Sequence, residues 1–202
     1  MALRGRTWRR RFGTTTITVR AQADAPPTVQ RAGTFTQVNP AANRLLVRSV
    51  TALVGGGAPV LDLFCGAGNL TLPLARIAPS VVAVDHDARG IEDGAANAAA
   101  AGLDNVRFVV AAADAYLRRH GLSGARVAVL DPPRTGAAAV THLLARLAPE
   151  RIVYVSCDPT TLARDARTLT GAGYAIGRVQ PLDLFPQGPH VETVLEAVLT
   201  AP

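Results

Sequence analysis

Cys157 is the residue of this sequence best placed to act as a nucleophile. It directly follows the apolar segment 151–156, which is typical of a buried β-strand, and it precedes a helix expected from Pro159 onward. The positive end of a helix dipole lowers the pKa of a nearby thiol, so this position favours a reactive thiolate. The alternative is that Cys157 is a small buried hydrophobic residue, as most isolated cysteines are.

A carboxylate and two prolines follow another apolar segment, which ends at Leu130. Residues 131–136 read Asp-Pro-Pro-Arg-Thr-Gly, and the two prolines make this loop rigid and poor in hydrogen-bond donors. Such a loop can hold Asp131 and neighbouring carbonyl groups against a planar base. The alternative is an ordinary loop with two prolines.

A glycine turn follows the first apolar strand. Residues 62–69 read Asp-Leu-Phe-Cys-Gly-Ala-Gly-Asn, and Gly66 and Gly68 allow a tight turn with close backbone approach to a ligand. The spacing departs from the G-x-G-x-x-G pattern of dinucleotide-binding folds. Cys65 lies inside this turn, and we expect it to pack around the cofactor.

Acidic residues follow the second and third expected strands. Asp85 ends a strand, where its carboxylate can accept hydrogen bonds from both ribose hydroxyls of an adenosine, and Asp87 is the competing candidate. Asp114 can accept from an adenine amino group or can be the N-cap of the next helix. Together the glycine turn and the two acids favour S-adenosylmethionine over NAD.

Apolar strands alternate with helices along most of the chain. We expect helices over residues 39–53, 69–77, 91–101, 114–120, 138–147 and 159–171, and strands over 60–64, 81–85, 106–110, 127–130, 151–156, 174–179 and 194–199. This alternation predicts an α/β fold with a parallel sheet covered on both faces. We expect the last two strands to pair antiparallel, which gives the seven-stranded, mostly parallel sheet of Rossmann-like class I methyltransferases.

Composition excludes several other classes of protein. Hydrophobic residues make up 49% of the chain, enough for a sizeable core, and no apolar run approaches the roughly 20 residues of a membrane span. Two cysteines cannot build a disulfide framework or a four-cysteine metal site. We therefore expect no membrane association, no metal and no iron–sulfur cluster.

Positive charge is concentrated near the N-terminus. All 21 basic residues are arginine, and nine of them lie in the first 48 residues, where Asp24 is the one acidic residue. This suggests a nucleic-acid partner, because guanidinium groups match phosphate geometry. A transit peptide or a GC-rich genome would give a similar composition. We divide the chain into a basic arm, residues 1–36, and a catalytic domain, residues 37–202.

Five ordered groups of residues resemble the catalytic domain of the RNA uracil-C5 methyltransferase family. They are FTQVN (35–39), DLFCGAGNLTLPLA (62–75), DPPRTG (131–136), SCDPTTLARD (156–165), and DLFP (183–186) with HVET (190–193). The resemblance covers roughly residues 35 to 200. It implies a protein that makes 5-methyluridine in ribosomal or transfer RNA with S-adenosylmethionine.

The resemblance also implies roles for individual residues. Cys157 matches the nucleophile that adds to C6 of uracil, and Glu192, which alone would read as a surface carboxylate, matches the base that removes the C5 proton. Positions that contact the cofactor or the target base are matched by Gln37, Phe64, Asn69, Asp85, Asp114 and Asp131. Arg134 would hold the loop or a phosphate, and His190 would have a structural hydrogen-bonding role.

The chain also departs from the family pattern. Larger members carry an N-terminal β-barrel, an insertion domain and often an iron–sulfur cluster, for which there is no room before Phe35. Asp158 replaces a frequent asparagine, a change that would slightly disfavour the thiolate. Either the basic arm replaces the missing domains or the chain is a fragment.

We therefore expect a monomeric, cytoplasmic enzyme that methylates uridine in RNA, with ribosomal RNA preferred over transfer RNA. One alternative is an inactive module that binds cofactor and RNA. The other is a methyltransferase acting on an exocyclic amine, against which Arg134 argues, because those enzymes carry an aromatic residue at that place.

Overall fold

Seven strands form the central sheet of the computed structural model, in the order β10-β11-β9-β8-β5-β6-β7. The structure describes residues 2–4, 9–11, 16–19, 28–31, 33, 37, 39–184, 188 and 191–200. The strands are β5 (Val60–Leu63), β6 (Val81–Asp85), β7 (Val106–Val110), β8 (Val127–Leu130), β9 (Arg151–Ser156), β10 (Tyr174–Leu182) and β11 (Glu192–Leu199). Strands β5 to β9 are parallel, and β11 runs antiparallel to both β9 and β10. The predicted sheet is confirmed.

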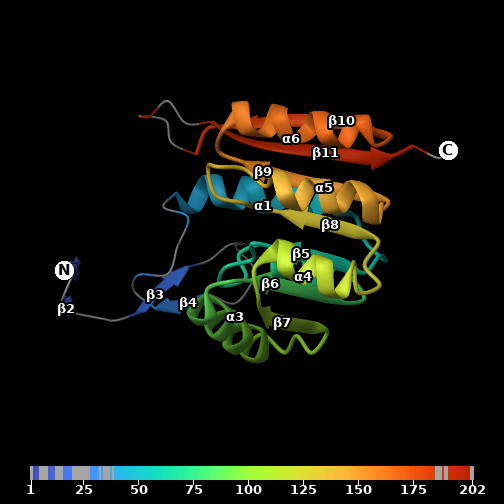
Figure 1. The fold of residues 1–202 in the computed structure, drawn as a ribbon. Coiled ribbons are helices and arrows are strands. Elements are labelled where there is room, and N and C mark those ends of the chain that lie inside the picture. The colour runs from blue at the N-terminus through green and yellow to red at the C-terminus, as the bar shows by residue number, and fades with distance from the viewer. Residues whose placement is uncertain are drawn as a thin grey trace.

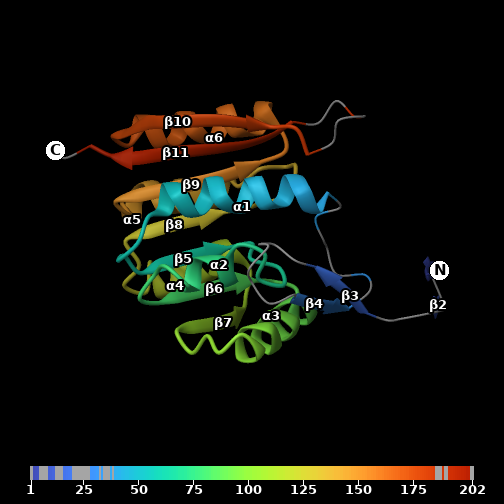
Figure 2. The same cartoon turned by 180° about the vertical axis from the view of Figure 1, so that it is seen from behind.

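Helices cover both faces of the sheet. They are α1 (Pro40–Val54), α2 (Thr71–Ala75), α3 (Ala88–Ala100), α4 (Ala113–His120), α5 (Ala138–Leu147) and α6 (Pro159–Gly171). Figures 1 and 2 show α4, α5 and α6 on one face, and α1 and α3 on the other. In the described part of the chain, no helix has both the length and the apolar composition needed to cross a membrane.

Strand alternation divides the core into two parts. Val127 and Val129 of β8 pack with α1 and α2, whereas Ala128 and Leu130 of the same strand pack with α4, α5 and α6. Successive side chains of a strand point to opposite faces, so a strand buried on both faces must be apolar throughout. Burial on both faces therefore explains why these strands are continuous apolar runs in the sequence.

Some element boundaries differ from those expected. Helix α3 begins three residues earlier than predicted, because the side chain of Asp87 caps it and accepts a hydrogen bond from the Arg89 amide at 3.0 Å. Helix α2 is shorter than predicted and covers only Thr71–Ala75. Strand β11 begins at Glu192, two residues earlier than predicted, which places this carboxylate in the sheet.

Part of the basic arm packs on helix α3. Strands β3 (Thr16–Val19) and β4 (Thr28–Arg31) pair antiparallel, and Val29 exchanges two backbone hydrogen bonds with the Asn97 side chain at 2.8 and 2.9 Å. Arg31 forms ion pairs with Asp93 at 2.7 Å and Glu92 at 2.9 Å. This arginine is therefore held by acidic groups of α3. Strands β1 (Ala2–Arg4) and β2 (Arg9–Arg11) form a further antiparallel pair.

Gly90 lets helix α3 approach the glycine turn closely. A Cβ atom at Gly90 would lie 3.0 Å from the carbonyl carbon and 3.1 Å from the carbonyl oxygen of Gly66. The turn is itself held in place, because the Gly66 amide donates to Asp85 Oδ2 at 2.9 Å. There is no room for a side chain between this helix and this turn.

We expect Gly90→Ala to destabilise the protein by about 1–3 kcal/mol, since a methyl group forced into a packed contact displaces backbone. Unfolding in urea measures this change. Gly171→Ala is the matched control, because its Cβ would meet nothing within 4 Å. In a helix with free space, this exchange is neutral or stabilising by roughly 0.5–1 kcal/mol. Equal stability of the two variants would contradict the close packing.

Candidate active site

Glu192 lies beside Cys157 at one edge of the sheet. In the antiparallel pair of β9 and β11, Thr193 is opposite Ser156, so the next residues along the two strands are Glu192 and Cys157. Opposite residues of an antiparallel pair project their side chains to the same face. The thiol and the carboxylate therefore come from distant parts of the chain and meet at the end of β9.

Asp131 and Asp62 belong to the same group of side chains. Val129 faces α1, and Asp131 follows it by two residues, directly after β8. Val60 also faces α1, and Asp62 follows it by two residues in the neighbouring strand β5. Period-two alternation therefore directs both carboxylates to the α1 face. The charges of Glu192 and Asp62 each raise the pKa of Asp131, as expected for neighbouring groups.

Burial raises the pKa of these carboxyl groups. Glu192 is 3% exposed, and burial raises its pKa to about 7. Burial also raises the pKa of Asp131 well above its ordinary value, with the charges of Glu192 and Asp62 adding to the effect. The pKa of Asp62 rises to about 7, mainly through burial, although a hydrogen bond from Thr71 at 2.6 Å opposes the rise. A group whose pKa lies near 7 can accept and release protons at neutral pH.

The net pKa of Cys157 lies on the other side of its ordinary value from the one that a helix dipole favours. Burial, followed by the negative charge of Glu192, raises the pKa of this half-buried thiol above its ordinary value. The positive charge of Arg134 and a backbone hydrogen bond lower it, and Asp131 raises it further. Desolvation and two nearby carboxylates therefore outweigh the favourable groups. Asp158, the N-cap of α6, accepts from the amides of Thr160 and Thr161 at 2.8 and 3.1 Å.

Cys65 is buried, whereas Cys157 is half-buried. Cys65 is buried against Ala83 and Ile91, and its Sγ donates to the Gly66 carbonyl oxygen at 3.7 Å. Burial, together with the charges of Asp62 and Asp85, raises the pKa of this thiol. Its role is packing beneath the glycine turn.

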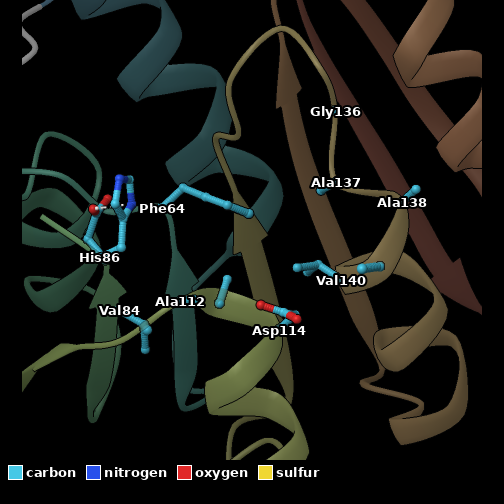
Figure 3. A pocket seen from close by; sticks show the side chains of 12 residues that line it. Phe64, Val84, His86, Ala112, Asp114, Gly136, Ala137, Ala138 and Val140 are labelled. Carbon is cyan, nitrogen blue, oxygen red and sulfur yellow. Dashed lines mark ion pairs between the residues drawn. The ribbon is translucent and has the colours of Figure 1, made fainter.

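A pocket of about 240 Å³ opens on the opposite face of the sheet, between the ends of the strands and helices α4 and α5 (Figure 3). Its lining consists of Phe64, Val84, Asp85, His86, Ala112, Ala113, Asp114 and residues 136–140. Phe64 has a φ of 65°, a left-handed conformation that is uncommon for a bulky residue. Strict alternation after Leu63 would direct Phe64 toward α1, so this conformation turns its ring into the pocket instead.

Asp85 is oriented by two backbone amides. Its Oδ2 accepts from Gly66 at 2.9 Å, and its Oδ1 accepts from Asp87 at 2.8 Å. His86 Nδ1 lies 3.2 Å from Oδ1, so the second lone pair of Oδ2 is left to accept a hydrogen bond from a ligand in the pocket. Because the side chain of Asp87 caps α3, Asp85 is the better candidate of the two.

Asp114 lines the pocket, and it is not the N-cap of α4. Ala112 occupies the N-cap position of α4, and Asp114 lies in the first turn. Its Oδ2 accepts from Arg118 at 3.1 Å, one helical turn further on. Figure 3 shows the carboxylate of Asp114 near Val140 and on the same side of the pocket as Ala112.

The other predicted cofactor residues lie outside this pocket lining. Asn69 forms a reciprocal amide pair with the buried Asn43 of α1, with distances of 2.8 and 3.0 Å, and so ties the glycine turn to that helix. Gly66 and Gly68 adopt φ values of 53° and 88°, which glycine accommodates without strain. Gln37 is half-buried. Phe35, Phe185, Pro186 and His190 lie outside the described residues.

Sequence reasoning missed Asn43 and Asp62. Asn43 is a polar residue on the buried side of an amphipathic helix, a signal that was available. Asp62 is the first residue of the glycine-turn motif and is fully buried, and its Oδ1 has no hydrogen-bond partner among the described residues. No cluster of metal-ligating side chains occurs within the residues that the structure describes.

Comparison with known proteins identifies the family. The sequence model described as tRNA (Uracil-5-)-methyltransferase matches residues 18–198. The 23S rRNA (uracil(1939)-C(5))-methyltransferase RlmD of Alkalilimnicola ehrlichii is 49% identical over 172 residues, which cover 81% of this chain and 38% of that protein. RlmD of Pseudomonas putida is 45% identical over 168 residues, covering 81% and 37%. The chain therefore spans less than two fifths of the length of these relatives.

Solved structures agree with this assignment. The tRNA (uracil-54, C5)-methyltransferase of Pyrococcus abyssi, in complex with S-adenosyl-L-homocysteine, has a TM-score of 0.81 and 32% identity, covering 96% of this chain and 49% of that one. A magnesium protoporphyrin IX methyltransferase from Synechocystis, with a TM-score of 0.64 and 22% identity, shares the class I methyltransferase fold, covering 80% and 81%. On the match over residues 18–198, the chain belongs to the tRNA (uracil-5-)-methyltransferase family.

Proposed function

We propose that this chain carries the methyl-transferring part of an enzyme that methylates C5 of uridine in RNA, with S-adenosylmethionine as the methyl donor. The observation that carries the proposal is the meeting of Cys157, Glu192 and Asp131 at the end of β9, where their charges act on one another. A thiol and a proton acceptor at one point are what methylation of an unreactive ring carbon requires.

The proposed reaction uses Cys157 as the nucleophile. Its thiolate adds to C6 of uracil, a C–S bond forms, and the electron pair of the C5–C6 double bond makes C5 nucleophilic. C5 forms a bond to the methyl carbon while the bond between that carbon and the donor sulfur breaks, so that a neutral thioether leaves. Glu192 then accepts the C5 proton. The C–S bond then breaks, so that the double bond and the thiolate are restored. The raised pKa of Glu192, about 7, suits a group that takes up a proton at neutral pH.

The pocket beside Phe64 is the proposed site of the nucleoside part of the donor. An aromatic wall suits stacking of a base, and the carboxylates of Asp85 and Asp114 are hydrogen-bond acceptors for ribose hydroxyls and an amino group. The glycine turn, with Gly66 and Gly68, would lie against the chain that links the two ends of the ligand. Bound there, the donor supplies an electrophilic methyl group.

Ribosomal RNA is the substrate we favour. The curated relatives with 45–49% identity are named as 23S rRNA methyltransferases, whereas the similar solved structure is named as a tRNA methyltransferase and is 32% identical. Such a substrate is consistent with a cytoplasmic protein, and we propose that it acts as a monomer. Mass spectrometry of nucleosides, after incubation with the donor and either 23S rRNA or tRNA, tests both the reaction and the preference.

We expect Cys157→Ala to lose methyl transfer by at least about a thousandfold, because the ring is no longer activated. RNA containing 5-fluorouridine should form a covalent complex with the parent chain and none with the variant, since fluorine cannot leave C5 as a proton does. Gel electrophoresis under denaturing conditions detects the complex. Cys65→Ala is the control, and its complex should persist. Methylation without a covalent complex would instead indicate chemistry at an exocyclic amine, and no methylation by the parent chain would indicate a binding module.

We expect Glu192→Gln to stop turnover while the covalent protein–RNA complex accumulates with unmodified RNA, because the amide cannot accept the C5 proton. In the parent chain, the rate of methyl transfer should increase as the pH rises through about 7, since Glu192 accepts a proton only when ionised. At lower pH the rate should decrease. Glu196→Gln on the same strand is the matched control; it pairs with Arg151 at 3.3 Å, away from Cys157. Equal turnover in the two variants would exclude Glu192 as the base.

We expect deletion of residues 1–12 to lower the affinity for RNA and to make that affinity less dependent on salt concentration. The deletion removes Arg4, Arg6, Arg9, Arg10 and Arg11. Each lost phosphate contact lowers the slope of log affinity against log salt by about 0.7–0.9. Filter binding at several salt concentrations measures the slope. An unchanged slope would show that this arginine cluster does not contact RNA.

A further inference from the structure

Asp165 of helix α6 is a fully buried carboxylate outside the site described above. Its Oδ2 accepts from the Ala137 amide and from the Tyr154 hydroxyl, each at 2.7 Å, and its Oδ1 accepts from Arg164 Nε at 2.8 Å. Burial alone would raise the pKa of Asp165, but the hydrogen bonds from Arg164, Ala137 and Tyr154 hold it below its ordinary value. The carboxylate is therefore ionised and committed to these three partners.

These contacts fix the loop between β8 and α5, residues 131–137, which we call the Pro-Pro loop. Thr161 Oγ1 donates to the Arg134 carbonyl at 3.2 Å, and Arg164 Nη2 donates to the Thr135 carbonyl at 3.1 Å. Together with the bond from Ala137 to Asp165, these bonds join three residues of α6 to the loop.

Gly136 allows the loop and the helix to lie this close together. It has a φ of 73°, and a Cβ atom there would lie 2.5 Å from Arg164 Nη2 and 2.8 Å from Asp165 Oδ2. A glycine is therefore required at this position both by the backbone conformation and by the absence of space. The Pro-Pro loop therefore packs directly against the side chains of α6.

The Pro-Pro loop carries charged groups that shift the pKa of Cys157. Asp131 begins it, and the positive charge of Arg134 lowers the pKa of Cys157, whereas the charges of Glu192 and Asp131 raise it. The end of the loop, from Gly136 onward, lines the pocket beside Phe64. Helix α6 itself starts two residues after Cys157, at Pro159. The contact between the Pro-Pro loop and helix α6 therefore connects Cys157, the charged groups that shift its pKa, and the wall of the pocket.

We propose that Asp165 is a positioning residue: by binding the Ala137 amide to helix α6, it holds Arg134 of the Pro-Pro loop beside Cys157. The inference rests on the proposed function, in which Cys157 is the nucleophile. Asp165 touches no reacting atom; it acts through the loop.

The test measures the reactivity of Cys157 in the 202-residue chain without RNA or methyl donor. Iodoacetamide alkylation is followed across a range of pH, and the peptide that contains Cys157 is quantified by mass spectrometry, so that Cys65 does not contribute. We expect Asp165→Ala to move the pH midpoint upward by about half a unit, which slows alkylation below the midpoint about threefold. Arg134→Ala should give the same shift, and the double variant should add nothing further.

Thr170→Ala is the matched control on the same helix, because Thr170 Oγ1 donates only to the Arg167 carbonyl at 3.1 Å, away from the loop. Its midpoint should equal that of the parent chain. Circular dichroism records folding, and if Asp165→Ala fails to fold, Tyr154→Phe, which removes one bond to the same oxygen, must shift the midpoint in the same direction. A lowered Tm with an unchanged midpoint would overturn the proposal. A shifted midpoint in a chain that transfers no methyl group would contradict the proposed function alone.

Discussion

The crowding of carboxyl groups around one thiol in a poorly solvated space sets the electrostatics at the end of β9. Glu192 is buried, Asp131 and Cys157 are half-buried, and the charge of Glu192 raises the pKa of both Asp131 and Cys157. Removing charges from water and placing like charges side by side both favour the protonated forms. The pKa of each of these groups is therefore raised, and the positive charge of Arg134 opposes the rise at Cys157.

The antiparallel strand makes this crowding possible. In a parallel sheet, all strands end at the same edge, and a residue that begins a strand lies at the opposite edge. Glu192 begins β11, and it reaches the end of β9 because β11 runs in the other direction. The departure from a parallel sheet thus brings a residue near the C-terminus of the chain to Cys157. A loop residue could reach the same place, but a strand holds it in register with Cys157.

The carboxyl group cluster and the pocket lie on different faces of the sheet. Asp62, Asp131, Cys157 and Glu192 face α1, while the pocket beside Phe64 opens toward α4 and α5. The strand ends and the glycine turn lie between these regions, so a ligand that serves both must cross the edge of the sheet. The left-handed conformation of Phe64 belongs to this arrangement, because it moves an aromatic ring from one face to the other. Asn43 and Asn69 join the glycine turn to α1 across the same edge.

The amino-acid sequence by itself determined the order of strands and helices along the chain, and the family, because periodicity and short motifs are local properties. Helices α5 and α6 and strands β8 and β9 agree with the expected ranges residue for residue. Only the tertiary structure decided that Glu192 is buried, that Asn69 pairs with Asn43, and that Cys157 is less acidic than an ordinary thiol. These properties come from desolvation and from charges on strands distant in the chain, which no local pattern encodes.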